Sequence, residues 1–395
     1  MTPLKNLVVL DFSRVLAGPL ATQLLAELGA DVIKVERPVT GDESRGWEPR
    51  TASGSSAYFH SVNRGKRSIT LDLKSPRGAQ IAASLARKAD VLIENFLPGH
   101  MQQLGLGYEA LAAGNPRLVY ISSTGFGQSG PYRNRKGYDT IFQALSGVMS
   151  LTGYPEGPPA KVGLPFADLT SGLWIAIATL SGLVGRGVSG KGCHIDLAML
   201  DVQVSLLTIA AARLFALGED PARTGTEHLG RVPSAAFQCR GGDWIHISGS
   251  DQHWEPLCSV LGLTELARDS QLRSNAGRLE QRGRVMEALT QAISQRERSP
   301  LVSALIAADV PVGEVNSVAQ VLADPHVLAR KIQGTFTHPV DGEFPALKQP
   351  LRLNGQEPPA LGTPPQLGAD TRAVLGQYLG LGDPAIDELA RGGVI

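Results

Sequence analysis

LVVLDFSRVLAGPLATQLLAELGADVIKVE, residues 7–36, contains two short β-rich runs on either side of a helical segment. The runs are Leu7–Phe12 and Asp31–Glu36, and the helical segment is Pro19–Leu28. A strand, a helix and a second strand in this order predict a βαβ unit, whose two strands are parallel. Further strand signals alternate with helical stretches at Ser68–Leu73, Val91–Asn95 and Leu118–Ser122. The sequence therefore predicts an α/β fold with a parallel sheet.

The composition limits the classes of partner and site. Lys plus Arg and Asp plus Glu both number 37, which argues against a nucleic-acid-binding surface and favours a small-molecule partner. Three scattered cysteines form no CxxC pair and eight histidines form no HxxxH or HExxH pair, so neither disulfides nor a metal site are predicted. The chain shows no signal-peptide order and no uninterrupted apolar run of about 18 residues, which predicts a cytoplasmic protein without a membrane partner.

Composition and turn signals predict two domains. Residues 1–200 are expected to form the first part of a large domain, with a tightly packed, buried helix around Thr170–Val184. A linker at 201–225 precedes a smaller domain at 226–310, where Trp244–Ser248 alternates as a half-buried strand. Residues 311–395 are expected to form a proline-rich link that returns to the large domain, with a last helix near Thr371–Leu379.

The turn after the first strand differs from the turn that binds dinucleotides. That turn needs Gly-x-Gly-x-x-Gly, whereas Val15–Pro19 has one glycine and a proline without a backbone donor, which argues against NAD. Arg37, directly after the second strand, has two interpretations. Its guanidinium can meet a phosphate on an adenosine ribose, or it can form a surface salt bridge.

Asp168 also has two interpretations. It follows a proline-containing loop and precedes the apolar helical stretch. As a helix N-cap, its carboxylate would accept a hydrogen bond from the first turn, a contact worth about 1 kcal/mol. As a nucleophile, it would lie in a dry site near helix-terminal dipoles that stabilise developing negative charge. Spacing alone favours the cap.

Ordered motifs along the chain resemble family III CoA-transferases, the group that includes formyl-CoA transferase, carnitine CoA-transferase and the methylacyl-CoA racemases. The motifs include R-V-L-A-G-P at 14–19, L-G-A-D-V-I-K-V-E at 28–36, N-R-G-K-R-S at 63–68, E-N-F-L-P-G at 94–99, G-F-G-Q-S-G-P at 125–131, K-G-Y-D at 136–139 and A-D-L-T-S-G at 167–172. The resemblance implies a Rossmann-like large domain with a parallel sheet, a smaller α/β domain, and an interlocked, ring-like homodimer. It also implies that Asp168 is the catalytic nucleophile, which forms a mixed anhydride and then an aspartyl-CoA thioester.

The same resemblance implies a set of residues that contact coenzyme A, the substrate carrier, while no permanently bound cofactor is expected. These are Val15, Ala17, Arg37, Leu71, Asn95, Phe96, Lys136, Tyr138 and Asp139. Arg37 and Lys136 would pair with phosphates. Relatives often carry an Arg where this chain has Gln103, which removes one expected phosphate contact.

Substrate specificity is expected to depend on Leu16, Arg45, Trp47 and Gly249. Leu16 replaces a glutamine of formyl-CoA transferase, which argues against the formyl-CoA and oxalate pair. The sequence looks most like the succinyl-CoA-dependent branch, with a dicarboxylate or a sulfinate acid as acceptor. Arg45 would hold the distal carboxylate or form a rim charge, and both interpretations stay open.

Two other activities remain as alternatives. The racemases carry a His where this chain has Tyr138, so a CoA-transferase is favoured over a racemase or isomerase. A non-catalytic CoA-binding protein is the third alternative.

Overall fold

The computed structural model describes residues 2–395. The chain divides into two compact units, and the first unit comprises the residues up to Met149 together with Lys161–Ala216 and Leu328–Ile395. The second unit comprises Ser150–Ala160 and Leu217–Val327. The domain boundaries predicted from the sequence, 1–200, 201–225, 226–310 and 311–395, stay a prediction.

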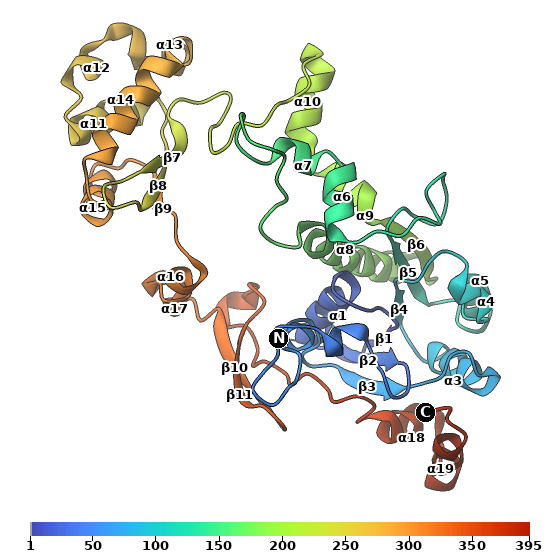
Figure 1. The fold of residues 1–395 in the computed structure, drawn as a ribbon. Coiled ribbons are helices and arrows are strands. Elements are labelled where there is room, and N and C mark those ends of the chain that lie inside the picture. Colours follow the sequence, from blue (N-terminus) through green and yellow to red (C-terminus); the bar gives the residue numbers. More distant parts are fainter. Residues whose placement is uncertain (1) are drawn as a thin grey trace. The chain divides into compact units, whose positions relative to one another are not determined.

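The first unit contains a six-stranded sheet in the order β3-β2-β1-β4-β5-β6, and every neighbouring pair is parallel (Figure 1). This is the strand order of a doubly wound α/β fold, in which ligands bind at the carboxyl ends of the strands. The strands are β1 (Val8–Asp11), β2 (Asp31–Glu36), β3 (Arg67–Thr70), β4 (Val91–Glu94), β5 (Val119–Thr124) and β6 (Cys193–Ala198).

Helices cover both faces of this sheet. Successive side chains of a strand point to opposite faces, so the apolar side chains of the buried strands need a helix layer on each side. Val9 packs in a core cluster with residues of α1 (Ala17–Glu27) and α8 (Phe166–Ser189), whereas Leu10 packs in another with α3 (Pro76–Ala86) and α18 (Thr371–Leu379). The other helices of this unit, with those that cross its boundaries, are α2 (Ala57–Val62), α4 (His100–Gln103), α5 (Tyr108–Gly114), α6 (Asp139–Leu145), α7 (Val148–Leu151), α9 (Met199–Ser205), α10 (Thr208–Leu217), α17 (Pro325–Ala329) and α19 (Asp383–Arg391), with 3₁₀ turns at Glu43–Gly46 and Leu353–Gly355. The antiparallel hairpin of β10 (Gln333–His338) and β11 (Gly342–Leu347) belongs to the same unit.

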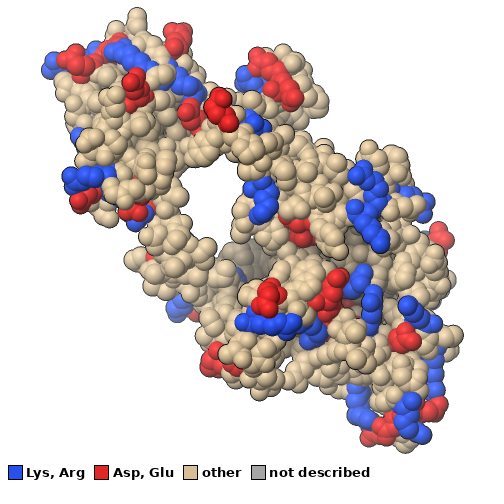
Figure 2. Space-filling model, viewed as in Figure 1, with Lys and Arg blue, Asp and Glu red and all other residues tan. Residues whose placement is uncertain are grey.

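The second unit is a three-stranded antiparallel sheet with helices around its own apolar core. The sheet consists of β7 (Ser234–Gln238), β8 (Trp244–Ser248) and β9 (Val312–Glu314). The helices are α11 (Asp251–Leu261), α12 (Thr264–Arg268), α13 (Asn275–Glu280), α14 (Arg282–Ser294), α15 (Arg298–Ala307) and α16 (Val318–Leu322), with a 3₁₀ turn at Ser270–Arg273. On the face shown in Figure 2, basic and acidic side chains are interspersed in both units.

The predicted α/β class with a parallel sheet is confirmed, and the predicted strands match β1 to β5 to within a few residues. The prediction of a fully buried helix around Thr170–Val184 is wrong for one face. Ala167, Ser171 and Ile175 of α8 are buried, whereas Leu173 and Ile177 are 51% and 49% exposed. Over residues 2–395, α8 is the one unbroken helix whose length and apolar composition would suit a membrane span, and the bent pair α9 and α10 passes the same test together.

Candidate active site

A buried charge network lies at the carboxyl ends of β1 and β2. Lys34 Nζ lies 2.9 Å from Asp42 Oδ2, and Lys66 Nζ lies 3.0 Å from Asp11 Oδ2, with all four side chains inaccessible to solvent. Burial raises the pKa of Asp42, but the charge of Lys34 and the hydrogen bonds from Lys34 and Ser44 together outweigh burial and lower that pKa to about 2. Burial lowers the pKa of Lys66 to about 8 despite the attraction of Asp11. These ion pairs fix the loop between β1 and α1.

Asp168 lies in the first turn of α8, but it does not cap that helix. The cap is Asp139, whose Oδ1 accepts hydrogen bonds from the backbone N–H groups of Ala167 at 2.7 Å and Asp168 at 3.2 Å. Its Oδ2 accepts a bond from Gln143 Nε2 at 2.6 Å. Because Asp139 satisfies these helix donors, the carboxylate of Asp168 needs no capping role.

The ionisation of Asp168 is unusual. Burial, followed by the negative charge of Asp139, raises the pKa of the Asp168 carboxyl to about 7. A carboxyl group with this pKa is ionised in a large fraction of molecules near neutral pH and is a stronger base than an exposed one.

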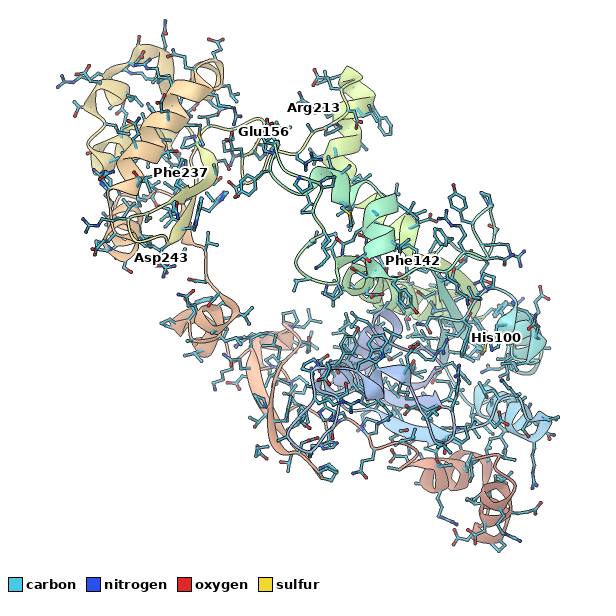
Figure 3. All side chains as sticks on the ribbon, viewed as in Figure 1. His100, Phe142, Glu156, Arg213, Phe237 and Asp243 are labelled. Atoms are coloured by element: carbon cyan, nitrogen blue, oxygen red, sulfur yellow. The ribbon has the colours of Figure 1, made fainter. Side chains whose placement is uncertain are left out.

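Asp168 lines a cavity of about 360 Å³ that the sequence motifs surround. Phe142 of α6 (Figure 3) forms part of the wall, and a Cβ at Gly125 or Gly137 would lie 2.5 or 2.6 Å from its ring. Only glycine therefore lets the two loops approach Phe142 so closely. The predicted site residues that line this cavity are Val15, Leu16, Ala17, Asn95, Phe96, Lys136, Tyr138 and Asp168.

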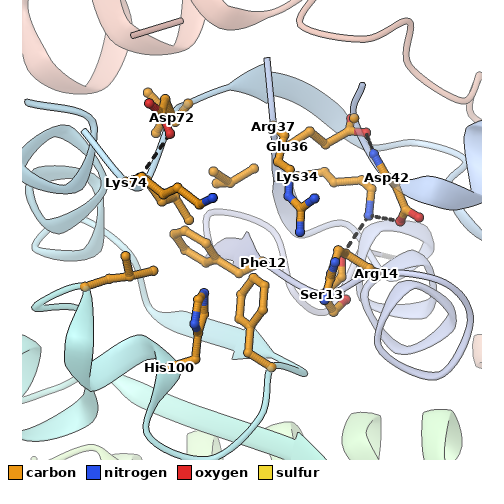
Figure 4. Close-up of a pocket in the computed structure, with 16 residues that line it drawn as sticks. Phe12, Ser13, Arg14, Lys34, Glu36, Arg37, Asp42, Asp72, Lys74 and His100 are labelled. Carbon is orange, nitrogen blue, oxygen red and sulfur yellow. Dashed lines mark hydrogen bonds and ion pairs between the residues drawn. The ribbon is translucent and has the colours of Figure 1, made fainter. Parts of the chain in front are cut away.

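A second cavity of about 120 Å³ shares Arg14 and Phe96 with the first (Figure 4). The predicted residues Arg37 and Leu71 line it, together with Lys74 and His100. Burial, then the charges of Arg14, Arg37 and Lys74, lowers the pKa of His100. Glu36, Asp42 and Asp72 also line this cavity, but Arg45 and Lys34 pair with the first two, and the cations Arg14, Arg37 and Lys74 suit a polyanionic ligand.

Four predicted residues do not line either cavity. Arg45 donates to both carboxylate oxygens of Glu36, each at 2.7 Å, and its guanidinium lies 3.8 Å from the Phe59 ring centroid. Glu36 therefore engages the guanidinium of Arg45, and the two interpretations of Arg45, as a ligand for a distal carboxylate and as a rim charge, stay predictions. Trp47 packs edge-on against Tyr58, Asp139 caps α8, and Gly249 lies in the second unit after β8.

Two further functional candidates lie outside the set of predicted site residues. Arg14, which the sequence places among the basic residues that follow strands, lines both cavities and lies over the Phe96 ring at 5.0 Å. Tyr58 is the second candidate. Burial, and then the nearby charges of Asp168, Asp42 and Asp139, raise the pKa of its hydroxyl to about 12. The spacing of Tyr58 in the chain gave no signal, because its proximity to Asp168 comes from tertiary packing.

One trio of potential metal ligands occurs among residues 2–395, namely His60, His338 and Asp341. The histidines are far apart in the sequence, so no motif revealed them. His338 Nδ1 accepts the backbone N–H of Asp341 at 3.2 Å and lies 2.8 Å from Asp341 Oδ2. None of the three lines the cavities described above.

Comparison with known proteins gives consistent matches over most of the chain. The sequence profile of CoA-transferase family III matches residues 4–371. A succinyl-CoA:glutarate CoA-transferase from Mus musculus is 37% identical over 395 residues, which cover 100% of this chain and 91% of the relative. An acetyl-CoA:oxalate CoA-transferase from Acetobacter aceti is 41% identical over 331 residues, covering 84% and 85%. The crystal structure of a CaiB/BaiF family protein from Brucella suis superposes with a TM-score of 0.85 and 39% identity, covering 95% of this chain and 99% of that one.

Proposed function

The chain belongs to CoA-transferase family III, and on this basis we propose that it moves CoA from succinyl-CoA to a dicarboxylic acid through a covalent intermediate on Asp168. The observation that supports the proposal is the position and ionisation of the Asp168 carboxyl. Its carboxyl lines a cavity, has a pKa raised to about 7, and is spared the capping role by Asp139. A desolvated, basic carboxylate at the rim of a ligand cavity has the properties of a nucleophile.

The reaction consists of four exchanges at carbonyl carbons. The ionised Asp168 attacks the thioester carbonyl of succinyl-CoA, which forms a mixed anhydride and releases the CoA thiolate. The thiolate attacks the aspartyl carbonyl, which releases succinate and leaves an aspartyl-CoA thioester. The acceptor carboxylate attacks that thioester and releases the thiolate again. The thiolate then attacks the acceptor carbonyl of the new anhydride, which yields the product acyl-CoA and regenerates Asp168.

The two adjoining cavities support an extended CoA molecule. The cations of the second cavity, Arg37 and Lys74, suit the adenosine and its phosphates, and Phe96 lies between the two cavities. The thioester then reaches Asp168 beside Val15, Leu16 and Ala17, where α1 begins. Backbone N–H groups at the start of a helix favour negative charge, which develops on the thioester oxygen during each attack.

The acceptor is proposed to be a dicarboxylic acid. The names of both relatives give one as the acceptor, glutarate for the mouse protein and oxalate for the Acetobacter protein. Arg14, Arg135 and Lys136 line the Asp168 cavity, and no carboxylate in the described chain forms an ion pair with them. After CoA phosphate takes part of this charge, the remainder is available to a second carboxylate of the acceptor.

A homodimer is part of the proposal, because an apolar stripe of the first unit is exposed to solvent among residues 2–395. Leu173, Ile177, Val184 and Val188 of α8 are between 49% and 89% exposed. Exposed apolar patches of this size are typical of interaction surfaces. The family resemblance implies that a second copy of the chain covers them.

Initial-velocity kinetics test the proposed function. We expect succinyl-CoA and glutarate to give parallel double-reciprocal lines, because CoA stays on Asp168 between the two half-reactions. A panel of oxalate, glutarate and butyrate, each with succinyl-CoA or acetyl-CoA as donor, identifies the preferred pair. Exchange of an α-proton in D₂O without any acceptor acid would instead support a racemase, and CoA binding without turnover would support a non-catalytic protein.

A further inference from the structure

Val15 adopts a backbone conformation that a valine rarely takes. Its φ is +73°, in the left-handed region, where a β-branched side chain is strained. The residue lies in the loop between β1 and α1, and its neighbours Leu16 and Ala17 line the Asp168 cavity with it. The strain is therefore located on the wall of the candidate active site.

Asp42 binds the backbone N–H of Val15. Its Oδ2 and Oδ1 accept the Val15 N–H at 3.2 and 3.3 Å. Asp42 is itself fixed by Lys34 Nζ at 2.9 Å and by Ser44, whose backbone N–H and hydroxyl donate at 2.9 and 2.8 Å. The carboxylate therefore cannot turn away from Val15 without breaking a buried ion pair.

The two residues before Val15 are held in the same way. Lys34 Nζ donates to the carbonyl oxygen of Ser13 at 2.9 Å, so one ion pair fixes both ends of the turn. Asn95 accepts the Arg14 N–H at 3.0 Å and donates to the Arg14 carbonyl at 2.9 Å. The Asn95 side chain thus binds both polar groups of the Arg14 backbone.

We propose that Asp42 is a positioning residue for the transferase reaction: together with Lys34, it holds Val15 in the left-handed conformation and so fixes the 15–17 wall of the cavity that contains Asp168. Asp42 acts through Val15 and does not touch Asp168. The kinetic part of this inference rests on the proposed function, whereas the structural part does not.

The kinetic test is a double-mutant cycle of Asp42→Asn and Val15→Gly. Asparagine keeps the shape of Asp42 but loses the charge that pairs with Lys34, so Val15 can relax to a negative φ. We expect D42N to lower kcat about tenfold or more, with a smaller change in the KM for succinyl-CoA. Glycine adopts a φ of +73° without strain, so in the V15G background D42N should lower kcat less than about threefold. Equal losses in both backgrounds, or wild-type kinetics for D42N, would overturn the proposal.

Amide hydrogen exchange gives a readout that does not need activity. The peptide covering residues 13–18 should exchange faster in D42N than in the wild type, because one of the two oxygens that accept the Val15 N–H becomes an NH₂ group and the charge that fixes the side chain is lost. If neither the wild type nor any variant transfers CoA but this difference in exchange appears, the proposed function fails, while the structural part of the inference, that Asp42 holds the backbone at Val15, stands. Unchanged exchange would contradict the positioning role.

Matched controls separate this effect from general damage. Val39 also has a positive φ, +67°, but is 92% exposed, so V39G should leave kinetics and exchange at 13–18 unchanged. Asp370 accepts the Ser68 N–H at 2.9 Å away from both cavities, so D370N should also leave them unchanged. If D42N does not fold, Ser44→Ala loosens Asp42 more mildly, and its loss of kcat should be reduced in the same way in the V15G background.

Discussion

Asp168 and Asp139 are two neighbouring carboxylates with different tasks, and their interaction predicts a pH dependence. Burial and the charge of Asp139 raise the pKa of Asp168 to about 7, and only the ionised form attacks a thioester. We therefore expect kcat/KM to rise with pH up to about 7 and then level off, falling tenfold per pH unit well below it. Asp139→Asn keeps an acceptor for the helix donors but removes the charge, so it should lower the pKa and move the acid limb to lower pH.

This expectation is checked by comparing the pH–rate profiles of the wild type and D139N. D370N serves as the control for loss of a distant carboxylate. D370N should keep the wild-type acid limb. An acid limb that D139N leaves in place would show that Asp139 does not repel the nucleophile.

The sequence located Asp168 but could not distinguish its two interpretations. Local spacing cannot show that Asp139, from α6, reaches the first turn of α8 and takes the capping role. Only the family resemblance favoured the nucleophile. Arg45 shows a similar limit, because its position in the sequence allowed a substrate ligand or a rim charge, and its pairing with Glu36 depends on tertiary packing.

Arg45 should contribute to stability rather than to substrate choice. Its removal takes the bidentate cation from the almost fully buried Glu36, which keeps only hydrogen bonds from Ser68 and the Asp42 N–H, so Arg45→Ala should lower the free energy of unfolding by about 3 kcal/mol. The ratio of kcat/KM for glutarate over butyrate should stay unchanged. Arg50→Ala is the control, since its pair with Glu48 is exposed and should contribute less than about 1 kcal/mol. Denaturant unfolding and acceptor kinetics measure both effects, and a lost preference for glutarate in R45A would support Arg45 as a substrate ligand.

Among the helices, the contact between α1 and α8 joins the two walls of the cavity. A Cβ at Gly172 would lie 2.9 Å from the Ala17 carbonyl oxygen and 3.0 Å from the Leu20 side chain. Gly172→Ala should therefore force the helices apart and destabilise the protein by about 1–3 kcal/mol. The matched substitution Gly376→Ala in α18, where the nearest atom is 3.7 Å away, should be neutral or slightly stabilising. Thermal unfolding of both variants checks this, and equal melting temperatures would contradict a tight α1–α8 contact.

The strands of the parallel sheet and the helices between them could be predicted from the sequence, because their hydrophobic patterns are local. The apolar pattern of α8 did not predict which of its residues are exposed, because the sequence does not distinguish an apolar residue covered by its own chain from one covered by a second molecule. This is why Leu173 and Ile177 were expected in the core and are exposed instead. The first unit is assembled from three separate segments of the chain, and this assembly likewise depends on long-range contacts that no local pattern specifies.

For the whole molecule, the exposed stripe of α8 predicts a stable dimer. Light scattering in buffer without detergent should give twice the mass of one chain at micromolar concentration. Ile177→Glu, which places a charge in the stripe, should shift the equilibrium toward monomer. Val39→Glu changes an exposed valine elsewhere and should leave the dimer intact. A wild-type monomer would contradict the homodimer.

The central claim is that Asp168 carries the covalent intermediate, and intact-protein mass spectrometry after incubation with succinyl-CoA and hydroxylamine tests it most directly. The account predicts a hydroxamate mapped to Asp168 in the wild type and in D139N, and no adduct in Asp168→Asn. An enzyme that transfers CoA without any adduct at Asp168, or that is labelled at another carboxylate, would contradict the account.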